Sequence, residues 1–210
     1  MDVFRWGVIG PGHIARRFAE DMRVVGDGEI VAVASRVVAR AEEFARAYDV
    51  ARVHASYEAL IADDSLDALY IATPHPMHAE VTIAALRAGR PVLCEKPLAP
   101  TRAEGERMVA AAREAGVFLM EGIWSRFLPS FTRARAWIAD GRIGTPRLVQ
   151  GSYGLNCRDP HSRLLNPDLA GGGLLDVGVY PLALAQWIFG GTACAVTALG
   201  HVGATGVDEQ

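Results

Sequence analysis

The sequence predicts a doubly wound α/β domain with a parallel sheet, followed by an incomplete α+β domain. Strand-like and helix-like segments alternate through the first 120 or so residues. The strand-like segments are apolar throughout, which is typical of parallel strands covered by helices on both faces. We place the first domain at residues 1–123 and the start of a second domain at 124–210.

The elements of the first domain follow from periodicity and from their end signals. Strands are expected at 4–10, 29–35, 67–74, 91–95 and 117–122, and helices at 13–25, 40–49, 77–89 and 101–116. The last of these helices begins with a capping box, Thr101 with Glu104, and Gly116 lies just beyond its end. Each strand except the last is thus expected to lead into a helix.

After about Trp124 the pattern changes. We expect a helix at 129–141, a strand at 145–154 and a long polar loop at 155–172. An apolar helix should follow at 171–191 and a last strand at 194–203. Two strands are few for a complete α+β domain, so the second domain is expected to be incomplete.

Composition narrows the classes of function. The chain is 50% hydrophobic and 21% charged, with a net charge of -3, so it lacks a general attraction for nucleic acid or anionic membranes. No basic, apolar leader and no apolar run of about 18 residues is present. Cys94, Cys157 and Cys194 are scattered and His161 has no ligand partner at a suitable spacing, so we expect no disulfide and no metal. A cytoplasmic protein is the expectation.

A glycine-rich turn follows the first strand. Gly10, Gly12 and Ala15 form G-x-G-x-x-A at the start of a helix, which is typical of a Rossmann dinucleotide-binding fold. Gly10 permits the tight turn, Gly12 lets a pyrophosphate approach the backbone, and Ala15 lets the helix pack close to the sheet. His13 and Ile14 then present helix N-terminal amides to the phosphates. The competing interpretation is a tight turn with no ligand.

The end of the second strand predicts the cofactor. An NAD-selective site has Asp or Glu here to bind the ribose 2′-hydroxyl, but this chain has Ser35 and Arg36. The Arg36 guanidinium suits a 2′-phosphate and Ser35 can donate to it, so we predict NADP rather than NAD. The alternative is that Arg36 is a solvated residue at the start of a helix.

Five motifs occur in order along the chain: "GVIGPGHIA", "ATPHPMH", "CEKPLA", "MEGIWSRFLP" and "GGGLLDVGVYPLAL". Together they resemble the Gfo/Idh/MocA oxidoreductases, nearest to the branch of dihydrodiol and D-xylose dehydrogenases. The resemblance covers nearly the whole chain. It implies hydride transfer between a nicotinamide and a vicinal diol or an aldose, and a homodimer for the full-length protein.

By this resemblance, Glu95 and Lys96 belong to the family's E-K-P motif, with Lys96 beside the nicotinamide and the reacting carbon. Lys96 also follows a strand, and ligands of open α/β sheets lie beyond the carboxyl ends of strands. At another strand end, four residues are implied to line the cofactor: Thr73, Pro74, His75 and His78. The family more often has Asn at position 75.

The resemblance also directs attention to Asp176 and Tyr180, four residues apart on one face of the expected helix. A free tyrosine has a pKa of about 10, and a lysine ammonium within about 4–6 Å favours the phenolate. Our hypothesis is that Tyr180 is the general acid/base, with Lys96 lowering its pKa and binding the substrate oxygen. Asp176 would orient a substrate hydroxyl or Lys96. The reverse assignment, with Lys96 as the base, remains open.

Trp124 and Phe127 are implied to form the wall of the substrate pocket, where an aromatic surface suits a diene-diol ring or a sugar face. Core packing is the alternative for both. Arg163, in the polar loop, is a candidate for reaching the substrate or a phosphate.

Family members extend well beyond position 210, into a large sheet against which the apolar helix would pack. We therefore expect these residues to be a fragment of a longer enzyme. Two other interpretations are a non-catalytic dinucleotide-binding protein, such as a sensor, and an inactive fragment. The sequence does not separate a dihydrodiol from D-xylose or another polyol as substrate.

Overall fold

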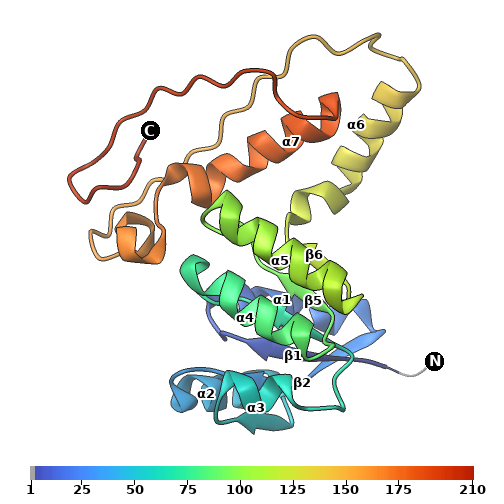
Figure 1. The fold of residues 1–210 in the computed structure, drawn as a ribbon, viewed down its shortest axis with the longest axis vertical. Helices are drawn as coiled ribbons and strands as arrows, with labels where there is room; N and C mark the ends of the chain where they lie inside the picture. The colour runs from blue at the N-terminus through green and yellow to red at the C-terminus, as the bar shows by residue number, and fades with distance from the viewer. Residues whose placement is uncertain (1–2) are drawn as a thin grey trace. The chain divides into compact units, whose positions relative to one another are not determined.

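The computed structural model describes residues 3–210 and divides into two compact units, Met1–Gly122 and Ile123–Gln210. The first unit holds a six-stranded parallel sheet in the order β3-β2-β1-β4-β5-β6 (Figure 1). The strands are β1 (Phe4–Ile9), β2 (Gly28–Ala34), β3 (Arg52–His54), β4 (Ala68–Ile71), β5 (Val92–Cys94) and β6 (Leu119–Glu121). The prediction of a doubly wound α/β domain is confirmed.

Helices cover both faces of this sheet. They are α1 (His13–Val25), α2 (Val38–Tyr48), α3 (Tyr57–Ile61), α4 (His78–Arg87) and α5 (Arg102–Ala115). Consecutive strand residues point to opposite faces: Val8 packs in the cluster with α1 and α2, and Ile9 packs in the cluster with α3, α4 and α5. Both faces are therefore buried, which explains why the central positions of the strands are apolar on both faces. On one face α4 and α5 lie side by side (Figure 1).

Helix ends agree with the local sequence signals. At the start of α5 the Thr101 side chain accepts from the Glu104 amide and the Glu104 carboxylate accepts from the Thr101 amide, and Gly116 ends the helix with φ 65°. The short elements β3 and α3 were not predicted. β3 has three residues and pairs with β2 alone, at the edge of the sheet, so no extended apolar run marks it.

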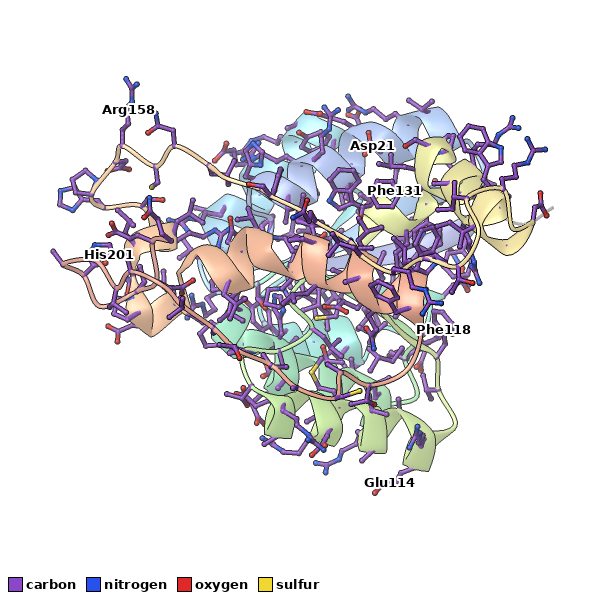
Figure 2. The ribbon with its side chains drawn as sticks, turned by 90° about the horizontal axis from the view of Figure 1, so that it is seen from above. Asp21, Glu114, Phe118, Phe131, Arg158 and His201 are labelled. Atoms are coloured by element: carbon purple, nitrogen blue, oxygen red, sulfur yellow. The ribbon has the colours of Figure 1, made fainter. Side chains whose placement is uncertain are left out.

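The regular elements described in the second unit are all helical, and the rest of the unit is irregular. It contains α6 (Pro129–Ala139) and α7 (Val179–Phe189), the 3₁₀ turns η2 (Trp124–Phe127), η3 (Arg163–Leu165) and η4 (Pro167–Leu169), and the π-helical turn η5 (Leu174–Gly178). The two long helices meet where the Phe131 ring lies 6.2 Å from the Trp187 ring, which the Arg135 guanidinium also covers. Figure 2 shows Phe131 on α6 and Arg158 on the polar loop, where its side chain points outward.

The two strands predicted at 145–154 and 194–203 are not formed. Among residues 123–210 the only β pairing described is one antiparallel bridge, Val202 with Asp208. An extended segment becomes a strand only when a neighbouring chain satisfies its ladder hydrogen bonds. Among the described residues, 145–154 has no β pairing, and in 194–203 only the last three residues bond the backbone of residues 207–210. Leu148 and Leu199 are 73% and 98% exposed, so the apolar residues that suggested the strands are not buried.

One described segment, Pro167–Phe189, has the length and the apolar composition of a membrane-crossing helix. The sequence expectation that no apolar run has this length therefore missed it. Length and composition alone are weak evidence for a membrane span. The segment contains Asp168 and Asp176, and Ala170 adopts a left-handed conformation (φ 50°) that interrupts it.

Candidate functional site

The carboxyl ends of five strands are joined along one edge of the sheet. Four backbone hydrogen bonds of 2.7–3.0 Å link them. The Gly10 amide donates to the Ala34 carbonyl and the Ala72 amide to the Ile9 carbonyl, while the Glu95 amide donates to the Ile71 carbonyl and the Gly122 amide to the Cys94 carbonyl. The strand order reverses between β1 and β4, which is where open α/β sheets bind their ligands. The predicted residues of the first unit all follow these strand ends.

The glycine turn has the geometry of a phosphate cradle. Gly10 has φ 86°, and a Cβ there would lie 2.8 Å from the Ala72 carbonyl oxygen, so only glycine fits. At Gly12 a Cβ would meet nothing within 4 Å, which leaves open space beside the backbone. Gly12 starts α1 without a side-chain cap, so the first amides of the helix face this space. His13 and Ile14 are exposed, in keeping with a contact to a bound anion.

At the end of β2, Ser35 is buried and its Oγ accepts from the Val37 amide at 3.2 Å. Arg36 is exposed and hydrogen-bonds Tyr57, whose pKa is raised by burial, an effect that the Arg36 charge and hydrogen bonds oppose. The guanidinium is thus held at the edge of the sheet. Sequence reasoning missed Tyr57, because it begins the unpredicted helix α3.

The segment after β4 supplies a buried polar atom. The Thr73 hydroxyl is buried, and it has no hydrogen-bond partner within residues 3–210. Such a group in a Rossmann edge fits a bound dinucleotide, because a ligand atom would satisfy it. Pro74 is half-buried and His75 is buried, with its ring 5.7 Å from that of His78.

His78 does not line this open edge. Its side chain is fully buried, with Nδ1 2.8 Å from the Pro97 carbonyl oxygen and Nε2 2.9 Å from the Thr73 carbonyl oxygen. Both ring nitrogens therefore face the protein's own backbone, which differs from the expectation that His78 lines the cofactor.

Glu95 and Lys96 lie at the end of β5. The Glu95 carboxylate accepts from the Tyr70 hydroxyl at 2.6 Å and from the Lys96 amide at 3.1 Å. Burial raises the pKa of Glu95, while these hydrogen bonds and the nearby Lys96 charge oppose that effect. Lys96 is half-buried and its peptide bond to Pro97 is cis.

Two residues behind this segment were not predicted. Tyr70 holds Glu95, and the Glu121 carboxylate accepts from the Leu98 amide at 2.7 Å. A signal for Tyr70 was present, since it carries the one hydroxyl among the apolar residues of β4. A second overlooked signal is that Lys96 is the only lysine in the sequence; the rest of the 21 Lys and Arg residues are arginine.

In the second unit the predicted residues form two hydrogen-bonded pairs. Asp176, buried in η5, accepts from the Arg163 guanidinium at 2.8 Å. The Tyr180 hydroxyl in α7 accepts from the Trp124 indole at 2.8 Å. Arg163 thus positions Asp176, and Trp124 positions the Tyr180 hydroxyl.

Trp124 and Phe127 present aromatic surface within this unit. Trp124 is 51% exposed and Phe127 is 66% exposed, so neither is a core residue among the described residues. Tyr153 packs edge-on against the Tyr180 ring at 5.6 Å. Trp124, Tyr153 and Tyr180 therefore form an aromatic group around one hydroxyl.

Within residues 3–210 no group of three His, Cys, Asp or Glu side chains is arranged to hold a metal ion. The chemical features at the edge of the first unit fit a dinucleotide instead. They are an uncapped helix start, an open glycine backbone and an unsatisfied buried hydroxyl.

Two family models match the chain. The model described as "Oxidoreductase family, NAD-binding Rossmann fold" matches residues 4–123, and the model described as "GFO/IDH/MocA C-terminal domain" matches residues 131–210. The two matches together cover most of both units.

A characterised protein also matches nearly the whole of this chain. Trans-1,2-dihydrobenzene-1,2-diol dehydrogenase from Bos taurus is 40% identical over 208 residues, which are 98% of this chain and 62% of that protein. The chain thus spans about three-fifths of the length of this relative.

Two solved structures are similar to this chain with a TM-score of 0.82 each. In both cases the similar region covers 90% of this chain and 58% of the other chain. KijD10, a 3-ketoreductase from Actinomadura kijaniata in complex with NADP and TDP-benzene, is 35% identical. An aldose-aldose oxidoreductase from Caulobacter crescentus complexed with glycerol is 31% identical.

Proposed function

Because the chain belongs to the Gfo/Idh/MocA oxidoreductase family, we propose that the whole protein is an NADP-dependent dehydrogenase of a vicinal diol or an aldose. The relatives support this substrate range, since one acts on a dihydrodiol and another on aldoses. The homodimer and the cytoplasmic location remain predictions.

Lys96 is the observation that carries this proposal. Each of the other Lys and Arg positions in the sequence is occupied by arginine, so cationic charge alone does not call for lysine here. A lysine can lose its proton, whereas a guanidinium keeps its proton at any physiological pH. The single lysine stands at the end of β5, on the same edge as the glycine turn. A proton-transfer or oxygen-binding role explains that choice.

The chain's own groups would handle the proton, while the cofactor, when bound, supplies the hydride acceptor. We propose that Tyr180 takes the proton from the substrate hydroxyl and that Lys96 binds the same oxygen and stabilises the phenolate. Trp124 donates to the Tyr180 hydroxyl and so holds it in one orientation. Asp176, fixed by Arg163, would orient a second hydroxyl of the substrate.

Replacing Arg36 with aspartate should reverse the cofactor preference. Aspartate repels a 2′-phosphate and accepts hydrogen bonds from a ribose diol, while arginine does the opposite. Losing a charged hydrogen bond of about 1.5–3 kcal/mol corresponds to roughly 10–100-fold in affinity. We expect the ratio of kcat/KM for NADP to that for NAD to fall by about that factor or more.

Arg46→Asp, at the other end of α2, makes the same change in net charge and should leave this ratio unaltered. An unaltered ratio in Arg36→Asp as well would contradict a role of Arg36 in cofactor choice.

The function itself is tested by NADPH formation at 340 nm with the full-length protein and a panel of trans-diols, aldoses and polyols. We expect turnover with at least one vicinal diol or aldose and little with simple alcohols. Tight NADP binding without turnover on any member of the panel would favour the non-catalytic interpretation.

A further inference from the structure

The backbone that carries Lys96 is fixed at four consecutive residues. The Glu95 amide donates to the Ile71 carbonyl at 2.9 Å, and the Lys96 amide donates to the Glu95 carboxylate. The Leu98 amide donates to Glu121. Proline has no N–H, so Pro97 can be held only through its carbonyl, and His78 is the side chain that approaches this carbonyl.

His78 also reaches the end of the neighbouring strand. Its Nε2 lies 2.9 Å from the Thr73 carbonyl oxygen, while Nδ1 lies 2.8 Å from that of Pro97. One fully buried ring thus lies between the segments that follow β4 and β5, and as a neutral imidazole it donates its single N–H to one of these two carbonyls at a time. Burial lowers the pKa of His78, the Lys96 charge lowers it further, and the carbonyls of Pro97, Thr73 and Leu98 oppose this shift.

We propose that His78 is a positioning residue, whose ring fixes the Pro97 carbonyl to the end of β4 and thereby sets the direction in which Lys96 leaves the sheet. This inference rests on the proposed role of Lys96. A catalytic side chain is effective only when its supporting groups are themselves locked, and a misplacement of about 1 Å can cost about 100-fold in rate.

The test compares His78→Leu, which removes both nitrogens, with His78→Gln, which keeps a donor. Thr82→Val is the matched control, since Thr82 is equally buried one turn further along α4. We expect kcat to fall about 10–100-fold in His78→Leu and less in His78→Gln, with the NADP Kd unchanged in both. Thr82→Val should keep the wild-type kcat.

A second readout needs no turnover. Lys96 is the only lysine within residues 1–210, so reductive ¹³C-methylation of this chain labels one side chain in it besides the N-terminal amine, and Lys96→Arg identifies its resonance in the full-length protein. We expect the Lys96 methyl resonance to shift and broaden in His78→Leu and to stay in place in Thr82→Val. The labelling experiment tests the inference even if the protein has no dehydrogenase activity. If His78→Leu does not fold, the same labelling is carried out on His78→Gln.

Two results would overturn the inference. The first is a folded His78→Leu variant with wild-type kcat and an unmoved Lys96 resonance. The second is a loss of NADP affinity of tenfold or more with kcat retained, which would make His78 a cofactor ligand.

Discussion

Lys96→Arg should reduce kcat by about 10²–10⁴-fold, the usual range for a general acid or base, while the NADP Kd stays within about threefold. The substitution keeps the positive charge and most of the length of the side chain. It replaces the compact ammonium, which is proposed to bind the substrate oxygen and stabilise the Tyr180 phenolate, with a larger planar group that cannot take the same position. The glycine turn and Arg36, which are proposed to bind the phosphates, are untouched. Single-turnover reduction of NADP, followed at 340 nm, measures the loss.

The reverse exchange at the surface is the control. Arg102 is exposed on α5, where its guanidinium pairs with Glu106, and Arg102→Lys should leave kcat unaltered. A Lys96→Arg variant that keeps more than about a tenth of the wild-type kcat would show that a guanidinium serves as well as the ammonium. That result would contradict the proposed binding of the substrate oxygen by Lys96.

Tyr180→Phe is expected to lower kcat by about 10²–10⁴-fold as well, with unchanged NADP affinity. The ring and its packing against Trp124 and Tyr153 remain, so the loss reports the hydroxyl alone. The Trp124 N–H would lose this acceptor, and because Trp124 is half-exposed, water can replace it at a small cost in stability. Thermal unfolding separates this structural cost from the effect on kcat.

Tyr48→Phe controls for the general effect of removing a phenol hydroxyl, because Tyr48 ends α2 and packs against Phe44. Near-normal turnover in Tyr180→Phe would transfer the role of proton acceptor to another group, with Lys96 the first candidate.

The sheet could be predicted because both of its faces are buried. Pairs such as Val8 and Ile9 enter different clusters, so the buried strand positions on both faces are apolar and the central strands stand out in the sequence. The glycine turn was equally clear, since Gly10 has no room for a Cβ. β3 was missed for the opposite reason, as a three-residue edge strand leaves almost no pattern.

The second unit could be predicted only in its helices. α6 and α7 have helical spacing, but a strand depends on a partner. No β pairing is described for 145–154, and 194–203 pairs only at its end, through the Val202–Asp208 bridge. Sequence patterns report which residues prefer an extended backbone and do not report whether a neighbouring chain is present.

Within the candidate site, strand ends were predictable and their supporting contacts were not. Lys96 and Arg36 follow strands and could be identified by position. Whether a polar residue faces a ligand or the protein depends on contacts between distant segments. His78 was expected at the cofactor but bonds backbone carbonyls, and Tyr70, which holds Glu95 from 25 residues away, was not considered.

The most direct test of the proposal that Lys96 and Tyr180 act on one oxygen is a double-mutant cycle of Lys96→Arg and Tyr180→Phe on kcat. Groups that act as one catalytic unit are strongly non-additive, because losing either one already abolishes the shared step. We predict that the double variant is no slower than the slower single variant, within about threefold. A double variant whose loss equals the product of the two single losses would show that the residues act independently, and would contradict the proposed mechanism.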